Sequence, residues 1–207
     1  MKDLAFYTGS LREYNITSAE QLEHLPGGVT FSGGEPLLQM RKLKTMLQKL
    51  KTEHIHTAIE TSLFAPQELV ETAIELIDLF YVDIKILDKA KCRQFLQGDL
   101  DTYLNNLDLL VQSGKPIVFR VPVIGGYTDD LENRKRVLAL LQQVVGNVLK
   151  VEIIKEHNLG AGKYDALKCG GNDVVLPQYS GVSEQLMAEY EVALKHALRI
   201  PIEVCMI

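Results

Sequence analysis

The chain has 207 residues and a mass of 23.2 kDa, a size at which one α/β domain is the expected organisation. Hydrophobic residues make up 46% of it and charged residues 24%, which excludes a disordered chain and a small disulfide-dependent scaffold. The formal net charge is -5, so the composition carries no electrostatic footprint for nucleic acid or an anionic membrane. We therefore expect a single domain over residues 1–207, with no nucleic acid and no membrane among its partners.

The cysteines and the amino-terminal residues predict the compartment. Cys92, Cys169 and Cys205 are too far apart in sequence for a zinc knuckle or a redox dithiol, and their small number indicates reduced thiols. Residues 1–10 lack the apolar stretch of a secretory signal, and no window is long and apolar enough to be a membrane span. Together these features predict a cytoplasmic protein.

From residue 27 onward, short apolar runs alternate with longer stretches of helical period, the pattern of repeated βα units on a parallel sheet. Most of the runs are apolar throughout, as strands covered on both faces should be. The expected strands are residues 28–32, 57–61, 79–84, 117–123, 148–154 and 200–206.

The stretches between these strands carry helix signals. Pro36 opens a helix whose apolar stripe is formed by Leu43, Met46, Leu47 and Leu50. Further helices are expected after residue 66, from about residue 104 to residue 113, after residue 128 and after residue 183. Residues 155–180 contain four glycines and no clear period, which predicts a long ordered excursion.

The element count limits the architecture without deciding it. Five βα-type strands and a terminal strand are too few for a closed eight-fold barrel. A partial or six-fold barrel and an open doubly wound sheet both fit the pattern.

Polar side chains gather where the apolar runs end. In parallel α/β proteins this edge of the sheet is where ligand sites are built. Each residue alone is as easily a solvated loop residue, but together they predict one site. The residues at or just after the strand ends are Ser32, Glu35, Glu60, Thr61, Asp83, Lys85 and His157.

The first group of candidates follows the first expected strand. Gly33 and Gly34 lack side chains, so backbone groups there can approach a ligand, and Glu35 beside them suits a ligand ammonium. The same residues followed by Pro36 also suit an ordinary tight turn into a helix. The residues alone leave both interpretations open.

The remaining acidic candidates lie on neighbouring strands. Glu60, Thr61 and Asp83 offer hard oxygen atoms that suit a small cation or an amino group, while strand-end hydrogen bonding is the alternative.

The basic candidates are Lys85, Arg120 and His157. Lys85 lies on the same side of an extended backbone as Asp83, so the two could bind opposite ends of a zwitterion or form a surface ion pair. Arg120 interrupts an apolar run, and a buried guanidinium needs an anion or several carbonyls as partners. His157 precedes a glycine-containing stretch and suits either a ligand loop or a structural role.

These motifs, in this order, resemble those of the glycyl radical enzyme activating enzymes of the pyruvate formate-lyase activase type, within the radical SAM superfamily. The resemblance covers most of the chain. The motifs that carry it are residues 29–39 (VTFSGGEPLLQ), 60–62 (ETS), 83–85 (DIK), 120–126 (RVPVIGG) and 157–160 (HNLG), followed by Lys163 and Tyr164.

The resemblance implies a partial (β/α)6 TIM-like barrel that binds S-adenosylmethionine (SAM) across the strand ends. It places Glu60, Thr61 and Asp83 around a monovalent cation or the amino acid moiety. In such enzymes a 4Fe-4S cluster gives an electron to the sulfonium, and the resulting 5′-deoxyadenosyl radical takes hydrogen from a glycine of a partner enzyme. The residues it places around SAM are Gly33, Gly34, Glu35, Glu60, Thr61, Asp83, Lys85, Arg120 and His157.

The chain departs from the family at the cluster motif. Those enzymes carry a Cys-x3-Cys-x2-Cys loop after the first barrel strand, whereas no cysteine precedes Cys92 here. Three thiolates must converge on one cluster, so we expect no 4Fe-4S cluster in this chain. We also expect an N-terminally shortened chain whose first βα unit is missing, with residues 3–10 as the helix before the second family strand. The unpaired sheet edge this leaves suits self-association.

Three functions remain open from the sequence. The first is the SAM-binding body of a radical activase, inactive alone, whose partners are a glycyl radical enzyme and, for the complete protein, a reductant such as flavodoxin or ferredoxin. The second is a non-catalytic module that docks a glycyl radical enzyme. The third, a barrel lyase with Lys85 as a Schiff-base nucleophile, leaves the other motifs unexplained.

Overall fold

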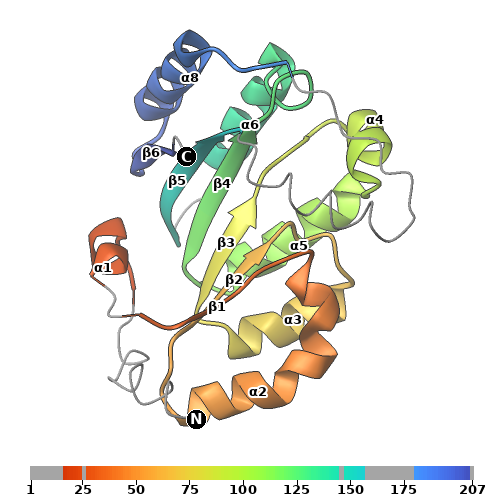
Figure 1. Cartoon of the computed structure of the whole chain (residues 1–207), viewed down its shortest axis with the longest axis vertical. Helices are drawn as coiled ribbons and strands as arrows, with labels where there is room; N and C mark the ends of the chain where they lie inside the picture. Colours follow the sequence, from red (N-terminus) through yellow and green to blue (C-terminus); the bar gives the residue numbers. More distant parts are fainter. Residues whose placement is uncertain (1–15, 25–26, 145–146, 157–179, 206–207) are drawn as a thin grey trace, which may run out of the picture.

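The computed structural model describes residues 16–24, 27–144, 147–156 and 180–205. Within these ranges, six strands form one parallel sheet whose spatial order follows the chain (Figure 1). The strands are β1 (Val29–Phe31), β2 (Thr57–Thr61), β3 (Leu79–Asp83), β4 (Ile117–Val123), β5 (Val148–Lys155) and β6 (Ile202–Cys205). All the expected strands are confirmed, with ends that shift by two residues at most.

The strand order decides between the two architectures that the sequence allowed. A doubly wound sheet reverses its order at a switch point, whereas here every strand lies beside the next one in sequence. The doubly wound alternative is therefore wrong. Each pair from β1·β2 to β5·β6 is parallel, and no pairing joins β1 to β6 among the described strands, so the sheet is an open partial barrel.

Helices follow most of the strands and cover one face of the sheet (Figure 1). The described helices are α1 (Ala19–Glu23), η3 (Pro36–Gln39), α2 (Met40–Thr52), α3 (Gln67–Leu76), α4 (Lys89–Lys91), η4 (Cys92–Leu96), α5 (Leu100–Gln112), α6 (Leu131–Gln143) and α8 (Glu184–Ala197). The expected helices are confirmed, and side-chain oxygens of Asp99, Asp130 and Ser183 cap three of them. The sequence reading missed α1 and the α4–η4 pair, which are too short to show a period.

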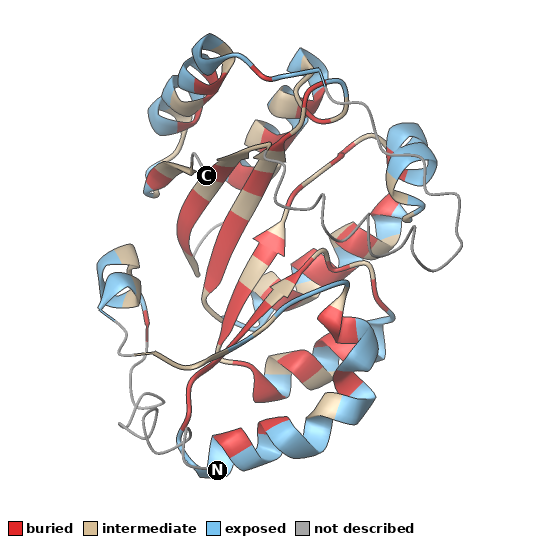
Figure 2. Ribbon diagram, in the orientation of Figure 1, coloured by how far each residue is buried: buried red, intermediate tan, exposed pale blue. Residues whose placement is uncertain are grey.

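Side chains alternate between two unlike faces of the sheet. The outward residues Ile59, Phe80, Val82 and Phe119 are fully buried against the helices and form the main core (Figure 2). The inward residues of the same strands are largely polar toward the strand ends, where Asp83 stands beside Arg120 in register. Consequently the core and the polar face are two sides of one sheet.

Near the amino ends of the strands, the inward face of the sheet is apolar and partly covered. Ala58, Leu79 and Val118 form a small second cluster there, and Leu22 of α1 packs against it. None of the described helices has the length and apolar character needed to cross a membrane.

Met46 is an exception to the predicted stripe of α2. Leu47 and Leu50 are buried as expected, but Met46 is 46% exposed, and Met40 at the start of the helix is fully buried instead. The reason is the helical period, because Met40, Leu47 and Leu50 fall on one side of α2, whereas Met46 is turned about 100° away from Leu47. Met46 is therefore left on the solvent side.

Asn106 on α5 links the helix layer to the end of β2. Its Nδ2 donates to the carbonyl oxygens of Leu63 (2.9 Å) and Ala65 (2.8 Å), and its exposed fraction is 1%. Leu63 has a positive φ of 57°, an unfavourable conformation for a residue with a side chain. The amide thus holds a strained turn directly after the strand-end residues.

Replacing Asn106 with Ala should lower the free energy of unfolding by about 2–3 kcal/mol, because the Ala65 carbonyl loses the Asn106 donor and the Leu63 carbonyl keeps only the Ala65 N–H. The adjacent Asn105→Ala is a matched control on the exposed face of α5 and should change it by less than about 0.5 kcal/mol. Urea denaturation followed by circular dichroism measures both. Equal effects of the two substitutions would contradict the role given to the Asn106 amide.

Candidate ligand site at the carboxyl ends of the strands

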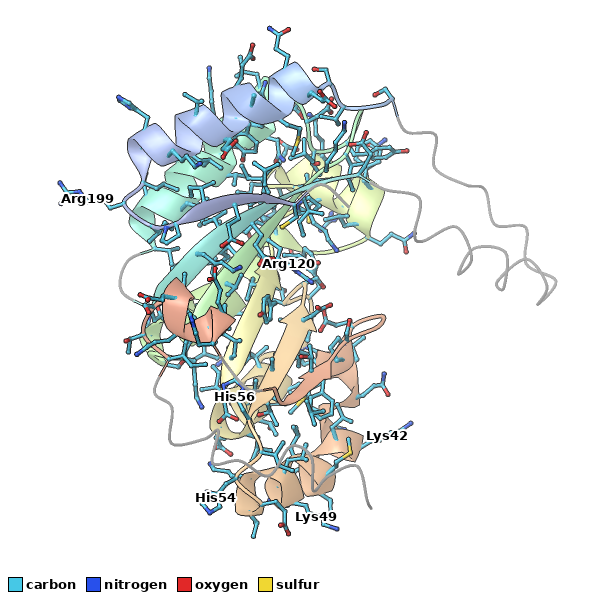
Figure 3. The ribbon with its side chains drawn as sticks, turned by 60° about the vertical axis from the view of Figure 1, so that its left-hand side comes forward. Lys42, Lys49, His54, His56, Arg120 and Arg199 are labelled. Carbon is cyan, nitrogen blue, oxygen red and sulfur yellow. The ribbon has the colours of Figure 1, made fainter. Side chains whose placement is uncertain are left out.

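Arg120 lies at the centre of the site, on the inward face of β4 (Figure 3). Its Nε is 2.8 Å from Oδ1 of Asp83, and its Nη1 is 3.1 Å from Oε1 of Glu60. Burial opposes the charge of this guanidinium, yet Asp83 and Glu60 together raise the pKa of Arg120 above its ordinary value. One cation thus joins carboxylates from the two preceding strands.

Two further side chains extend this network along the sheet edge. The Ser32 hydroxyl, just after β1, donates to Oε2 of Glu60 at 2.7 Å. At the other end, Nζ of Lys85 is 3.3 Å from Oδ2 of Asp83. The side chains of Lys85 and Glu60 are 33% and 32% exposed, against 19% for Asp83 and 17% for Arg120, so the network opens toward solvent at Lys85 and at Glu60. With two acids and two bases, it carries no net charge.

Glu35 belongs to a second cluster that clamps the turn after β1 onto the end of β2. Thr61 Oγ1 donates to its Oε1 at 2.7 Å, and the Ser62 backbone N–H and hydroxyl donate to its Oε2 at 2.8 and 2.5 Å. The Leu37 N–H also donates to Oε1, at 3.1 Å, as an N-cap of η3. Four donors occupy this carboxylate.

The two glycines before Glu35 leave the mouth of the site open. Gly33 and Gly34 have positive φ values of 88° and 57°, which favour glycine. A Cβ added to either would meet nothing within 4 Å. The backbone of this turn is therefore followed by the fixed Glu35 and has open space beside both glycines.

A buried amide holds the chain around Lys85. Asn133 of α6 is 4% exposed, and its Nδ2 donates to the Lys85 carbonyl at 2.8 Å while its Oδ1 accepts from the Leu87 N–H at 2.9 Å. The position of Lys85 is consequently set from beneath by α6.

A third polar cluster continues the inward face onto β5 and β6. Lys150 Nζ is 2.9 Å from Glu152 Oε1 and 2.7 Å from Glu203 Oε2. Burial opposes its charge, but the two carboxylates raise the pKa of Lys150 above its ordinary value. Tyr81 lies between the clusters, and the Arg120 guanidinium carbon is 6.0 Å from its ring centre. Burial is the main cause that raises the pKa of the Tyr81 hydroxyl, and the charge of Glu152 is the second.

The structure gathers most of the predicted residues at one edge of the sheet but divides them into two clusters. Glu60, Asp83, Lys85 and Arg120 form one network, while Thr61 turns away from Glu60 and bonds to Glu35. Among the described residues, no three His, Cys, Asp or Glu side chains are grouped as metal ligands. The cation site at Glu60, Thr61 and Asp83 stays a prediction, and His157 lies outside the described residues.

The sequence reading singled out neither Tyr81 nor the Lys150 cluster. A usable signal existed, because side chains alternate along a strand and Tyr81 stands two residues before Asp83. Lys150 and Glu152 interrupt an apolar run in the same way that Arg120 does. Ser62 was visible only as part of its motif.

The described cysteines do not form an iron–sulfur ligand set. Cys92 is buried in η4 with its thiol donating to the Gly98 carbonyl, and Cys205 lies on β6. Burial raises the pKa of the Cys92 thiol, which opposes the thiolate that a cluster needs. Cys169 lies outside the described residues, so the expectation that this chain holds no 4Fe-4S cluster stays a prediction.

Comparison with known proteins adds sequence relatives. The family model of the radical SAM superfamily matches residues 14–138. The 4-hydroxyphenylacetate decarboxylase activating enzyme of Clostridioides difficile (strain CD196) is 37% identical over 140 residues, which are 67% of this chain and 44% of that protein. The benzylsuccinate synthase activating enzyme of Thauera aromatica is 35% identical over 174 residues, which are 84% of this chain and 51% of that protein. The chain therefore spans about half the length of these relatives.

A solved structure shares the fold. It is a domain of pyruvate-formate lyase-activating enzyme from Bacteroides vulgatus ATCC 8482, which matches with a TM-score of 0.70 and 23% identity over 87% of this chain and 99% of that one. This similarity confirms the open, partial TIM-like sheet.

Replacing Arg120 with Met should lower the free energy of unfolding by about 2–3 kcal/mol, because two partly buried carboxylates lose their counter-ion. Lys85→Met removes a more exposed cation with one partner and should cost less than about 1 kcal/mol. The comparison uses urea denaturation at pH 7. A Lys85→Met variant as unstable as Arg120→Met would show that the guanidinium does not organise the site.

Proposed function

Because the chain belongs to the radical SAM superfamily, we propose that its strand-end site binds SAM and that the chain is the SAM-binding body of a glycyl radical enzyme activating enzyme. The activity proposed for the complete protein is removal of a hydrogen atom from a glycine of a partner enzyme. A reductant such as flavodoxin or ferredoxin and a cytoplasmic location are part of the proposal. Two of the relatives are activating enzymes by name, which supports this class of partner.

The charge balance of the Arg120 network is the observation that carries the proposal. A ligand with a single charge would leave one sign in excess, whereas a zwitterion such as the methionyl end of SAM keeps the balance. Lys85 is the more exposed of the two cations and suits the ligand carboxylate, with Arg120 behind it. The fixed backbone of Gly33 and Gly34 suits the ligand ammonium, since the Glu35 carboxylate is occupied by its own donors.

The rest of the inward face suits the remainder of the molecule. The Lys150 cluster contains two acids and one base, and this surplus of negative charge is complementary to a sulfonium. When bound beside a reduced iron–sulfur cluster, SAM supplies the radical chemistry of the family. The described residues do not fit that cluster, so the function proposed for this chain itself is binding and orientation of SAM.

Calorimetric titration of the chain with SAM tests the proposal. We expect saturable binding that weakens at least tenfold in Arg120→Met, and in Gly34→Ala, whose methyl group points into the open mouth at a conformational cost of about 1 kcal/mol. Lys135→Met on the exposed surface of α6 is the control and should bind as the wild type does.

Two outcomes of this titration would contradict the proposal. The first is a folded wild-type chain that does not bind SAM, which together with binding of a glycyl radical enzyme would favour a docking module. The second is SAM binding that none of the strand-end substitutions weakens. Thermal unfolding of each variant, measured alongside, separates loss of the site from loss of the fold.

A further inference from the structure

The parallel register aligns the inward side chains of neighbouring strands into rows across the sheet. The row nearest the carboxyl ends is entirely charged and consists of Asp83, Arg120, Glu152 and Glu203, on β3 to β6 in turn. All four take part in the Arg120 network or in the Lys150 cluster. The inward face is therefore charged along four strands at the level of the proposed site.

The next row marks the change from polar to apolar side chains. It consists of Glu60, Tyr81, Val118 and Lys150, on β2 to β5 in turn. Glu60 and Lys150 extend to the charged groups above them through their ion pairs. Val118 is fully buried in the small apolar cluster below. Of these four residues, Tyr81 is thus the one whose side chain borders both regions.

A cavity of about 320 Å³ lies on the amino-terminal side of Tyr81. It is lined, among others, by Leu79 and Tyr81 of β3, Ala58 of β2, Leu22 of α1 and the backbone of Gly28. Ala58 supplies only a methyl group to the inward face, which leaves the space below the tyrosine ring unfilled. The floor of the strand-end site therefore has a hollow behind it.

The Tyr81 ring borders the strand-end site as well as the cavity. The guanidinium carbon of Arg120 is 6.0 Å from the ring centre, and Glu60 is the register partner of Tyr81 on β2. Burial, and after it the charge of Glu152, raises the pKa of the Tyr81 hydroxyl, so the side chain is neutral at pH 7. Tyr81 therefore adds no charge to the balanced network and separates the site from the cavity by its bulk.

We infer that Tyr81 is a specificity-determining residue whose ring closes the floor of the strand-end site and limits the S-alkyl group of a bound sulfonium to the size of a methyl group. This inference rests on the proposed function, in which the methionyl end lies beside Lys85 and the sulfonium faces the Lys150 cluster. Because Tyr81 lies between those groups, the sulfur and its substituent lie over the ring. A larger substituent would meet the ring, and a packed site accepts added carbon atoms poorly.

Calorimetric titration of the 207-residue chain with two ligands tests this role. The ligands are SAM and its analogue in which an n-propyl group replaces the S-methyl group. The wild type should bind the analogue at least tenfold more weakly than SAM. In Tyr81→Ala the propyl group can enter the cavity, so the two Kd values should lie within threefold of each other. Tyr81→Phe keeps the ring and should discriminate as the wild type does.

Further variants separate the role of the ring from the size of the cavity. Leu22→Ala enlarges the cavity from the α1 side but leaves the ring in place, so it should discriminate as the wild type does. Ala58→Leu added to Tyr81→Ala fills the cavity and should restore at least a fivefold preference for SAM. Tyr81→Val, a residue suited to a strand, replaces Tyr81→Ala if thermal unfolding shows that the alanine variant is not folded.

The inference is wrong if the wild type binds both ligands equally or if the shortened Tyr81 variant discriminates as strongly as the wild type. An equal loss of discrimination in Leu22→Ala, or no recovery on adding Ala58→Leu, would also overturn it. The two proposals fail in different ways. A folded wild type that does not bind SAM rejects both, whereas SAM binding with unchanged discrimination in the shortened Tyr81 variant rejects only the role of Tyr81.

Discussion

The site depends on one guanidinium held between two carboxylates of neighbouring strands. Arg120 stands in register with Asp83, and the same side chain reaches Glu60 one strand further along the sheet. Parallel strands make this arrangement possible because all their carboxyl ends meet at one edge. The inward side chains at that edge must neutralise one another, since the opposite face of the sheet is fully committed to the apolar core. The sheet therefore requires apolar packing on one face and charge balance among the polar side chains on the other.

The sequence predicts the scaffold well because buried parallel strands are nearly continuous apolar runs. Each run became a strand of the open sheet, and the residues that end or interrupt the runs became the site. The alternation of side chains along a strand does not predict which polar residues pair with one another. Thr61 follows Glu60 in the chain but leaves β2 on the other side, where it bonds to Glu35, and no local pattern indicates that partner. The short α4–η4 segment was unpredictable for a similar reason, as it depends on the Asp88 cap and on a left-handed residue at Gln97.

The open sheet also separates two surfaces of unlike composition. The inward face offers a balanced set of charges around a fixed glycine turn, whereas the outward helix layer offers a basic stripe with exposed Leu38 and Met46. The placement of Met46 shows how small changes create such surfaces. Met40, Leu47 and Leu50 occupy the core side of α2, and a methionine of the expected apolar stripe is left in solvent. Net charge gave no hint of this stripe, because the acidic remainder of the chain conceals a local excess of lysine.

A crystal structure of the chain grown with SAM tests the central claim most directly. The account predicts the methionyl group at the carboxyl ends of β1 to β4, with its ammonium on the backbone of the Gly33–Gly34 turn and its carboxylate beside Lys85 and Arg120. It also predicts that Glu35 keeps its bonds to Thr61 and Ser62. SAM bound elsewhere on the sheet, or a methionyl group whose ammonium displaces Thr61 from Glu35, would contradict it.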